Sequence, residues 1–244
     1  MPKPPPFFVV EGPLEPGGIV SLEGPERRHA RARRLGTGDA VRLLDAAGAE
    51  AEGAIERSTR DGCTIRVGAV RRRPAEPGVE ILVAAIRAPR LAWLVEKATE
   101  IGAAAVTIVG SERSQRRRVE DAGNDLARLV RIAREAAAQS GQSTPPAIAG
   151  PIPPDEALAR ARSSASAILL DASGDPFPGA LAAPAAVWVG PEGGWSPEEI
   201  ARSEDAGWRR ARLPGATLRT ETAAIAALIL AVRAIDTARR GSGQ

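Results

Sequence analysis

The sequence contains few of the residue types that serve as metal ligands, redox groups or catalytic bases. Among its 244 residues there is one cysteine (Cys63), one histidine (His29) and no tyrosine. One cysteine cannot form an intrachain disulfide framework, and one cysteine with one histidine cannot build a zinc site of the Cys/His type. A Ser-His-Asp or Cys-His mechanism would depend on His29, which lies inside a run of arginines. We therefore expect no metal in the functional site.

Long apolar runs are missing as well. No stretch of 18 or more apolar residues occurs, so no transmembrane helix is expected. Residues 1–6 contain four prolines and no apolar segment, which is unlike a signal peptide. We expect a soluble, cytoplasmic protein without a membrane partner. A hydrophobic content of 43% permits a sizeable core, and 26% charged residues is typical of a folded chain.

The small net charge of +3 is unevenly placed. Residues 1–74 contain 13 basic and 10 acidic side chains, whereas residues 75–244 contain 20 of each. Only Lys3 and Lys97 are lysines, and the other basic residues are arginines. The whole excess of positive charge therefore lies in the first third of the chain, which permits a nucleic-acid partner without requiring one.

A break at residues 71–78, Arg-Arg-Arg-Pro-Ala-Glu-Pro-Gly, is typical of a linker. Before it, short apolar segments alternate with glycine and proline turns, and this spacing predicts a small β-barrel over residues 1–74. Its strands are expected at residues 7–10, 19–22, 40–44, 51–55 and 63–70. The segment 25–35 is the exception and is expected to be helical.

After the break, strands alternate with helices, which predicts an α/β domain with a parallel sheet over residues 75–244. Residues 79–86 form a continuous apolar run, as in a strand buried on both faces. Further strands are expected at residues 104–109, 167–170, 185–189 and 210–213. Helices are expected at residues 89–101, 121–139, 155–162, from 197, and 222–239. In open sheets of this kind, ligands bind at the carboxyl ends of the strands.

The most informative motif is Gly190-Pro191-Glu192-Gly193-Gly194, between a predicted strand and a predicted helix. The helix start carries an N-cap serine, a proline and a capping-box acid, namely Ser196, Pro197 and Glu199. The glycines allow the backbone to approach a ligand closely, although a tight turn that needs glycine is an equal alternative. The motif lacks the spacing of a Walker A loop or a dinucleotide fingerprint. Because Glu192 would repel phosphate, the loop favours a ligand with hydroxyls or a positive charge.

A second motif, residues 213–223, also leads from a strand end to a helix start, with Thr220 or Thr222 as the expected N-cap. Arg219 and Glu221 are its only charged residues. From the pattern alone, a salt-bridged helix start, with glutamate favoured by the helix dipole, is a simpler interpretation than catalysis.

Two arginine clusters are further candidate functional motifs. Residues 113–118 hold four arginines that could grip phosphates, although such runs are usually solvated loops. Residues 27–34 hold five arginines around His29, and on a helix Arg27, Arg31 and Arg34 would share a face. A histidine there is expected to be structural or to contact RNA rather than to act as a base.

Taken together, seven blocks over nearly 220 residues resemble the RsmE family, the bacterial 16S ribosomal RNA (uracil-N3)-methyltransferases of the SPOUT class. The blocks are residues 7–9, 34–39, 96–102, 111–114, 135–146, 190–194 and 218–223. The sequence departs from the family pattern at Pro6, Gln142 and Ala216, where the family often has arginine.

The resemblance implies a PUA-like RNA-binding β-barrel (residues 1–74) and a SPOUT methyltransferase domain with a trefoil knot (residues 75–244), assembled as a homodimer. It implies S-adenosylmethionine as the methyl donor, and 16S ribosomal RNA or the small ribosomal subunit as the partner. Two alternatives stay open: a related knotted methyltransferase acting on another RNA base or position, and a non-catalytic RNA-binding protein.

The resemblance also implies site residues. The cofactor pocket would comprise Leu169, Leu170, Gly190, Pro191, Glu192, Gly193, Gly194, Leu213, Pro214, Thr217 and Leu218. Arg219 and Glu221 are the expected catalytic residues: Arg219 would stabilise the uracil anion, and Glu221 would position Arg219 or take the N3 proton. RNA contacts are expected from Arg27, Arg28, Arg31, Arg34, Arg113, Arg116 and Gln139.

Overall fold

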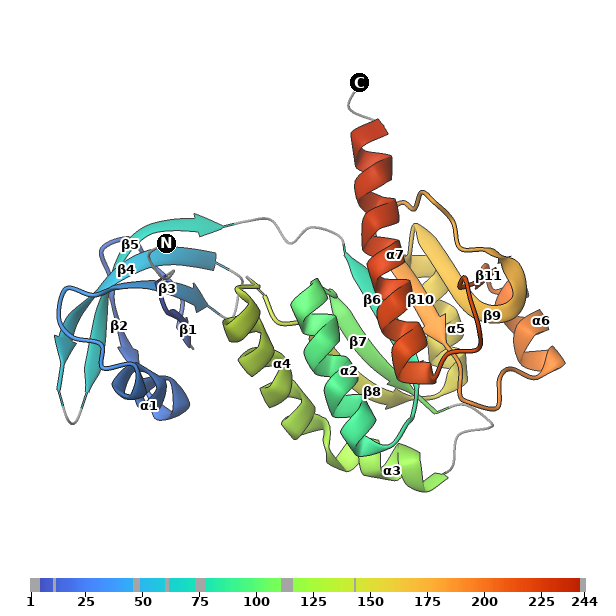
Figure 1. Ribbon diagram of the computed structural model, residues 1–244, viewed down its shortest axis with the longest axis horizontal. Helices are drawn as coiled ribbons and strands as arrows, with labels where there is room; N and C mark the ends of the chain where they lie inside the picture. Colours follow the sequence, from blue (N-terminus) through green and yellow to red (C-terminus); the bar gives the residue numbers. More distant parts are fainter. Residues whose placement is uncertain are drawn as a thin grey trace. The chain divides into compact units, whose positions relative to one another are not determined.

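The computed structural model describes residues 5–10, 12–45, 49–59, 62–72, 78–110, 116–142 and 144–241 (Figure 1). The chain divides into two compact units. Unit 1 consists of Met1–Glu76 and Ala137–Thr144, and unit 2 consists of Pro77–Ala136 and Pro145–Gln244. Most of the predicted linker at residues 71–78 lies outside the described residues.

Unit 1 is built on a curled, mixed sheet with the strand order β1-β3-β4-β5-β2. The strands are β1 (Phe7–Val10), β2 (Ile19–Leu22), β3 (Ala40–Asp45), β4 (Ala49–Ser58) and β5 (Cys63–Arg72). β1 pairs with β3 in parallel, and the other neighbours are antiparallel. Phe8, Leu43 and Ile65 are completely buried in its core. Each of the five predicted strands is found, with β4 and β5 longer than predicted.

The helix α1 (Gly24–Ala32) packs on this core through Ala30. It is shorter than the predicted segment 25–35. Arg33 is its C-cap, and Arg34 follows with a positive φ of 54°. Arg34 therefore lies beyond the helix, and the prediction that it shares a helical face with Arg27 and Arg31 is wrong.

Unit 2 is built on a parallel sheet with the strand order β11-β9-β10-β6-β7-β8. The strands are β6 (Val79–Ala84), β7 (Ala105–Val109), β8 (Ala147–Ile152), β9 (Ser166–Pro176), β10 (Ala185–Val189) and β11 (Arg209–Arg212). The predicted α/β architecture with a parallel sheet is confirmed.

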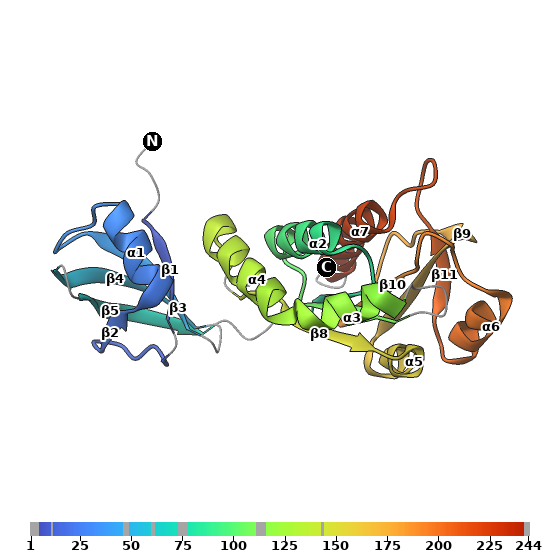
Figure 2. The same ribbon diagram turned by 90° about the horizontal axis from the view of Figure 1, so that it is seen from below.

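Helices cover both faces of this sheet, and Figure 2 shows α2 and α7 on one side with α5 and α6 on the other. The helices are α2 (Ala88–Ile101), α3 (Arg116–Asn124), α4 (Leu126–Ser140), α5 (Pro154–Ser163), α6 (Pro197–Asp205) and α7 (Thr220–Gly241). In β6, Ile81 and Val83 belong to the core cluster beneath α2 and α7, whereas Leu82 belongs to the opposite cluster around Trp188. β6 is thus buried on both faces, as its apolar run predicts.

Three elements of unit 2 differ from the prediction. The expected helix 121–139 is two helices, α3 and α4, which meet at Asp125. β8 was not predicted, because its Gly150-Pro151 pair is unfavourable in a strand, and β8 tolerates the proline as an edge strand of the sheet. β9 continues past residue 170 to Pro176. In the described parts of the chain, no helix has both the length and the apolar character needed to cross a membrane.

Candidate active site

Three neighbouring strands of unit 2 end around one cavity. β9 pairs with β10 as far as Leu170, β10 ends at Val189, and β11 ends at Arg212. Because parallel strands end at the same sheet edge, the segments that follow them lie together. They enclose a cavity of about 300 Å³, lined by residues of the segments 170–172, 189–195 and 211–223. This is the place where open α/β sheets hold their ligands.

The glycine-rich loop that follows β10 is fixed by its downstream helix. Ser196 is the N-cap of α6: its Oγ accepts a 3.1 Å hydrogen bond from the backbone N–H of Glu199, and its own N–H donates to Glu199 Oε2 at 2.8 Å. The predicted capping box is confirmed. Within the loop, Gly194 has a φ of +67°, and its N–H donates to the carbonyl of Pro191. A side chain at position 194 would be strained, so the turn requires glycine there.

Gly190 is needed for a different reason. A Cβ atom at this position would lie 2.7 Å from Cε2 of the Trp195 ring, far inside van der Waals contact. The Trp195 indole N–H donates a 2.8 Å hydrogen bond to the carbonyl oxygen of Leu170. The ring is buried and lines the cavity. Trp195 therefore braces the loop against β9, a role that the sequence motifs did not reveal.

The start of α7 is tied to the same loop. The helix begins at Thr220, whose hydroxyl donates a 3.2 Å hydrogen bond to the carbonyl of Gly190. The N–H of Ala223 bonds to the carbonyl of Arg219 at 2.8 Å. Thr220 is thus the first residue of the helix rather than its N-cap, and Thr222 lies within the first turn. The predicted N-cap is wrong because the Thr220 hydroxyl serves the glycine-rich loop.

The charged groups beside the cavity come from three elements. Glu221 is 7% exposed, whereas Arg219, on the preceding loop, is exposed. Glu221 Oε1 lies 3.4 Å from Nε of Arg90, on the first turn of α2, and Arg90 Nη1 donates to Glu192 Oε1 at 2.8 Å. The pairing that the structure gives Glu221 is therefore with Arg90 and not with Arg219. Arg90 was not found by sequence analysis, because it lies more than 100 positions from either carboxylate.

Most of the predicted cofactor residues line the cavity. These are Leu170, Gly190, Pro191, Glu192, Gly194, Leu213, Thr217 and Leu218. Leu169 instead packs in the core cluster with Trp188 on the other face of the sheet, because successive strand residues point to opposite faces. Among the described residues, Gly193, Pro214, Arg219 and Glu221 adjoin the lining segments without being part of the wall.

The predicted RNA contacts lie mainly in unit 1. Arg28, Arg31 and Arg34 are exposed, and Arg27 is half-buried. Gln139 is exposed near the end of α4, in the part of that helix that belongs to unit 1. Arg113 lies outside the described residues, and the side chain of Arg116 is not among the described ones.

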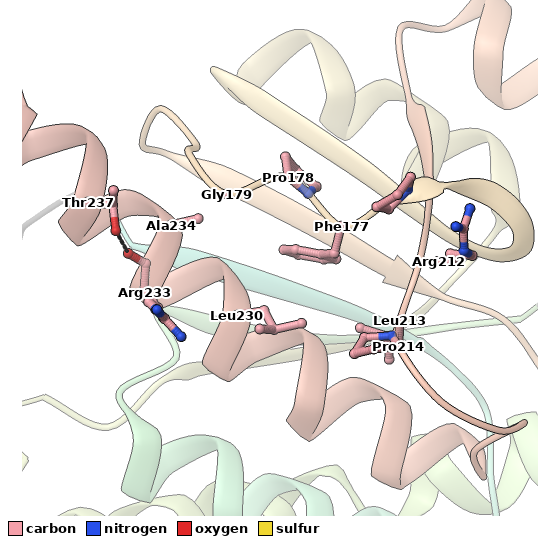
Figure 3. Close-up of a pocket in the computed structure, with 11 residues that line it drawn as sticks. Phe177, Pro178, Gly179, Arg212, Leu213, Pro214, Leu230, Arg233, Ala234 and Thr237 are labelled. Atoms are coloured by element: carbon pink, nitrogen blue, oxygen red, sulfur yellow. Dashed lines mark hydrogen bonds between the residues drawn. The ribbon is translucent and has the colours of Figure 1, made fainter.

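A second, larger pocket adjoins the cavity. It measures about 480 Å³ and shares Arg212 and Leu213 with the first. Figure 3 shows the Phe177 ring facing Leu230 of α7, with Leu213 and Pro214 beside them. Its walls are mainly apolar. Pro214, predicted for the cofactor pocket, lines this one.

The chemistry of the first cavity is that of a binding site for a partly apolar, polyhydroxyl or cationic molecule. Leucine side chains supply apolar walls, the loop backbone supplies polar groups, and Asp171 and Glu192 place carboxylates in the lining. Such a mixture of apolar surface and a few convergent polar groups is typical of small-molecule sites.

Comparison with known proteins gives consistent matches. A family model described as an RNA methyltransferase domain matches residues 74–232. The chain is 31% identical over 238 residues to ribosomal RNA small subunit methyltransferase E of Mycobacterium bovis, which covers 91% of this chain and 89% of that protein. The crystal structure of a ribosomal RNA small subunit methyltransferase E from Neisseria gonorrhoeae, bound to S-adenosylmethionine, matches with a TM-score of 0.81 at 25% identity over 92% of this chain and 95% of that chain. A Legionella pneumophila chain solved with the same bound cofactor gives 0.79 at 25% identity, over 93% and 97%.

Proposed function

Because the chain belongs to the RNA methyltransferase family of ribosomal RNA small subunit methyltransferase E, we propose that it methylates N3 of a uridine in 16S ribosomal RNA with S-adenosylmethionine as the donor. The observation that carries this proposal is the cavity at the ends of β9, β10 and β11, whose lining includes residues of two blocks of the resemblance, 190–194 and 218–223. The match extends over both units of the chain rather than over the α/β unit alone.

The residues of the cavity suit this cofactor. Leu170, Leu213 and Leu218 offer an apolar wall for an adenine ring, and the backbone of the glycine-rich loop offers donors and acceptors for hydroxyls. Asp171 adds a carboxylate to the lining that favours a cationic sulfonium, whereas the charge of Glu192 is already paired with Arg90. The bound cofactor supplies an electrophilic methyl group, so neither a metal nor a protein nucleophile is required.

The protein's own part in the reaction is to position and polarise the uracil. Arg219 is exposed at the rim and can donate to O2 or O4 of the base, stabilising the charge left when N3 loses its proton. Glu221 is the candidate for taking that proton or for positioning a neighbouring arginine. Because the carboxylate is paired with Arg90, the arginine that it positions is Arg90 rather than Arg219.

The target uridine must be accessible, because a paired uracil hides N3 at its Watson–Crick edge. We propose that Arg27, Arg28, Arg31 and Arg34 of unit 1, with Arg113, Arg116 and Gln139, hold the RNA backbone. We also propose that residues 1–74 form a PUA-like barrel and that residues 75–244 form a SPOUT domain with a trefoil knot. The working form is a cytoplasmic homodimer that acts on 16S ribosomal RNA or the small subunit.

Two measurements test the function. Calorimetric titration with S-adenosylmethionine separates a methyltransferase from a non-catalytic RNA-binding protein, because only the former binds the cofactor specifically. Mapping methylated nucleotides in 16S ribosomal RNA, from a deletion strain with and without the restored gene, tests the target. Loss and return of one N3-methyluridine supports the proposal, and loss of a different mark supports a related enzyme acting on another base or position.

A further inference from the structure

Arg90 lies at a position where a positive charge is electrostatically unfavourable. It lies on the first turn of α2, which begins at Ala88, and the positive end of a helix dipole disfavours a cation there. The Arg90 side chain is nevertheless largely buried, with 31% of it exposed. Two carboxylates from other elements offset the dipole: Glu192 of the glycine-rich loop and Glu221 at the start of α7.

The two carboxylates depend on Arg90 to different degrees. Glu192 is 49% exposed in its side chain, so water can solvate it without the arginine. The side chain of Glu221 is 9% exposed, and its Oε2 is buried without a hydrogen bond from any residue that the structure describes. Burying a carboxylate is costly unless a cation compensates it, so Glu221 fixes Arg90 while Arg90 stabilises Glu221. Nη1 of the same guanidinium donates to Glu192 of the loop.

We propose that Arg90 is a positioning residue that holds the glycine-rich loop, through Glu192, in the shape that binds S-adenosylmethionine, with Glu221 as its anchor. This inference rests on the proposed function, since it names how the cofactor cavity is kept in shape. Without Arg90, Glu192 and Glu221 are two neighbouring carboxylates that repel each other, and the half-exposed loop carboxylate is the one free to move. The planar guanidinium suits the task because it presents Nε to Glu221 and Nη1 to Glu192 from one rigid group, whereas a lysine offers all its donors from a single atom at the end of a flexible stem.

The test compares cofactor affinity among matched variants. Arg90→Met removes the guanidinium with similar side-chain volume, and we expect the Kd for S-adenosylmethionine to rise by about tenfold, a typical effect of losing a half-buried ion pair. Arg90→Lys keeps the charge and is expected to restore part of the affinity. The KM for the methyl donor should rise in parallel, while the KM for RNA stays within about twofold of wild type.

Arg160 provides a matched control. It also lies between two carboxylates, with Nε 3.8 Å from Glu80 and Nη2 3.8 Å from Glu156, and its side chain is 36% exposed. It lies on α5, on the other face of the sheet. Arg160→Met should leave the Kd for the cofactor unchanged although it, too, removes an arginine placed between two carboxylates.

A double-mutant cycle decides whether Arg90 acts through the loop. If it does, Arg90→Met together with Glu192→Gln binds the cofactor no more weakly than the weaker single variant. Full additivity of the two effects, or an unchanged Kd in folded Arg90→Met, overturns the inference. Should Arg90→Met fail to fold because Glu221 is left buried, Arg90→Met/Glu221→Gln removes that charge, and an unchanged Kd there overturns the inference equally. Failure of the wild-type protein to bind the cofactor would instead reject the proposed function, and the role of Arg90 with it.

Discussion

The indole nitrogen of Trp195 donates a 2.8 Å hydrogen bond to the backbone carbonyl oxygen of Leu170. This bond joins the residue directly after the glycine-rich loop to the point where β9 leaves β10. The same ring stands 5.0 Å from the ring of Trp188, nearly edge-on. The wall of the cavity is therefore continuous with the tryptophan cluster in the core.

Replacing Trp195 by phenylalanine keeps an aromatic ring but leaves the Leu170 carbonyl without its donor. We expect the free energy of unfolding to fall by about 1–2 kcal/mol, and the affinity for S-adenosylmethionine to weaken by several-fold. Chemical denaturation and calorimetry measure the two effects. Trp208→Phe is the matched control, because the Trp208 N–H also bonds to a backbone carbonyl, that of Leu158, at 3.2 Å, away from the cavity. Equal loss of cofactor affinity in both variants would contradict the prediction.

Gly190→Ala introduces a methyl group where the Trp195 ring stands 2.7 Å away. Either the ring or the loop must shift, and we expect overpacking to cost about 1–3 kcal/mol of stability together with most of the cofactor affinity. Gly179→Ala serves as the control, because a Cβ there meets nothing within 4 Å. Thermal unfolding and calorimetry compare the two proteins. A Gly190→Ala protein that binds the cofactor like the wild type would show that the loop has room to adapt.

Arg219→Ala and Glu221→Gln test the proposed roles in turnover. Removing a group that stabilises developing negative charge commonly lowers kcat by about 100-fold or more, and we expect this for Arg219→Ala with little change in cofactor affinity. Glu221→Gln should also lower turnover. Single-turnover assays with saturating RNA and cofactor measure the chemical step. If both variants keep near-wild-type turnover with unchanged RNA binding, neither residue has the assigned role.

The arginines of unit 1 should determine the salt dependence of RNA binding. Each phosphate contact that is lost reduces the slope of log K against log salt by about 0.7–0.9. We expect Arg31→Ala with Arg34→Ala to flatten the slope by up to twice that amount. The double variant Arg239→Ala with Arg240→Ala, near the end of α7, removes the same charge from unit 2 and should leave the slope unchanged. An unaltered slope in the Arg31→Ala/Arg34→Ala variant would show that these two arginines do not contact the RNA.

The environment of His29 predicts a pH effect on stability. Burial, and then the neighbouring Arg33, lower the pKa of His29 below its usual value of 6.5. Arg33 Nε donates to His29 Nε2 at 2.8 Å, which requires the neutral ring, and this outweighs Glu26, whose Oε2 lies 3.9 Å from Nδ1. The unfolded chain takes up this proton at a higher pH than the folded chain does. The contribution of the neutral His29 to the free energy of unfolding is therefore fully present above about pH 6.5, and it is lost as the pH drops.

Thermal unfolding between pH 8 and pH 5 tests this effect. The decrease in Tm should be smaller in His29→Gln than in the wild type, since glutamine does not titrate. An identical decrease in both proteins would assign the acid sensitivity to carboxylates instead.

Much of the fold follows from local sequence signals. The apolar run of β6 and the capping box at Ser196 each specify their structure over a few residues, and both were predicted. β8 was missed because Gly150 and Pro151 argue against a strand, and only its place at the sheet edge makes them acceptable. The break at Asp125 between α3 and α4 also went unpredicted, because the apolar periodicity continues through it.

The site was predictable where it depends on backbone, and less so where it depends on tertiary contacts. The glycine-rich loop and residues 213–218 were found because glycine and a helix start are visible in sequence. Arg90 and Trp195 were not found, since an arginine on a first turn and a tryptophan beside a loop have no distinctive pattern. The separation of Arg34 from the face of α1 follows from one positive φ.

The strand order of unit 2 has a consequence for how the protein is made. β6, synthesised first, lies between β7 and β10, and β10 leaves the ribosome about 100 residues after it, at roughly 5–20 residues per second. The half of the sheet from β6 to β8 can therefore assemble early, whereas every wall of the cavity lies between Leu170 and Ala223. Such distant parallel pairings form slowly. A nascent chain thus completes unit 1 and half of the parallel sheet well before it forms the cavity.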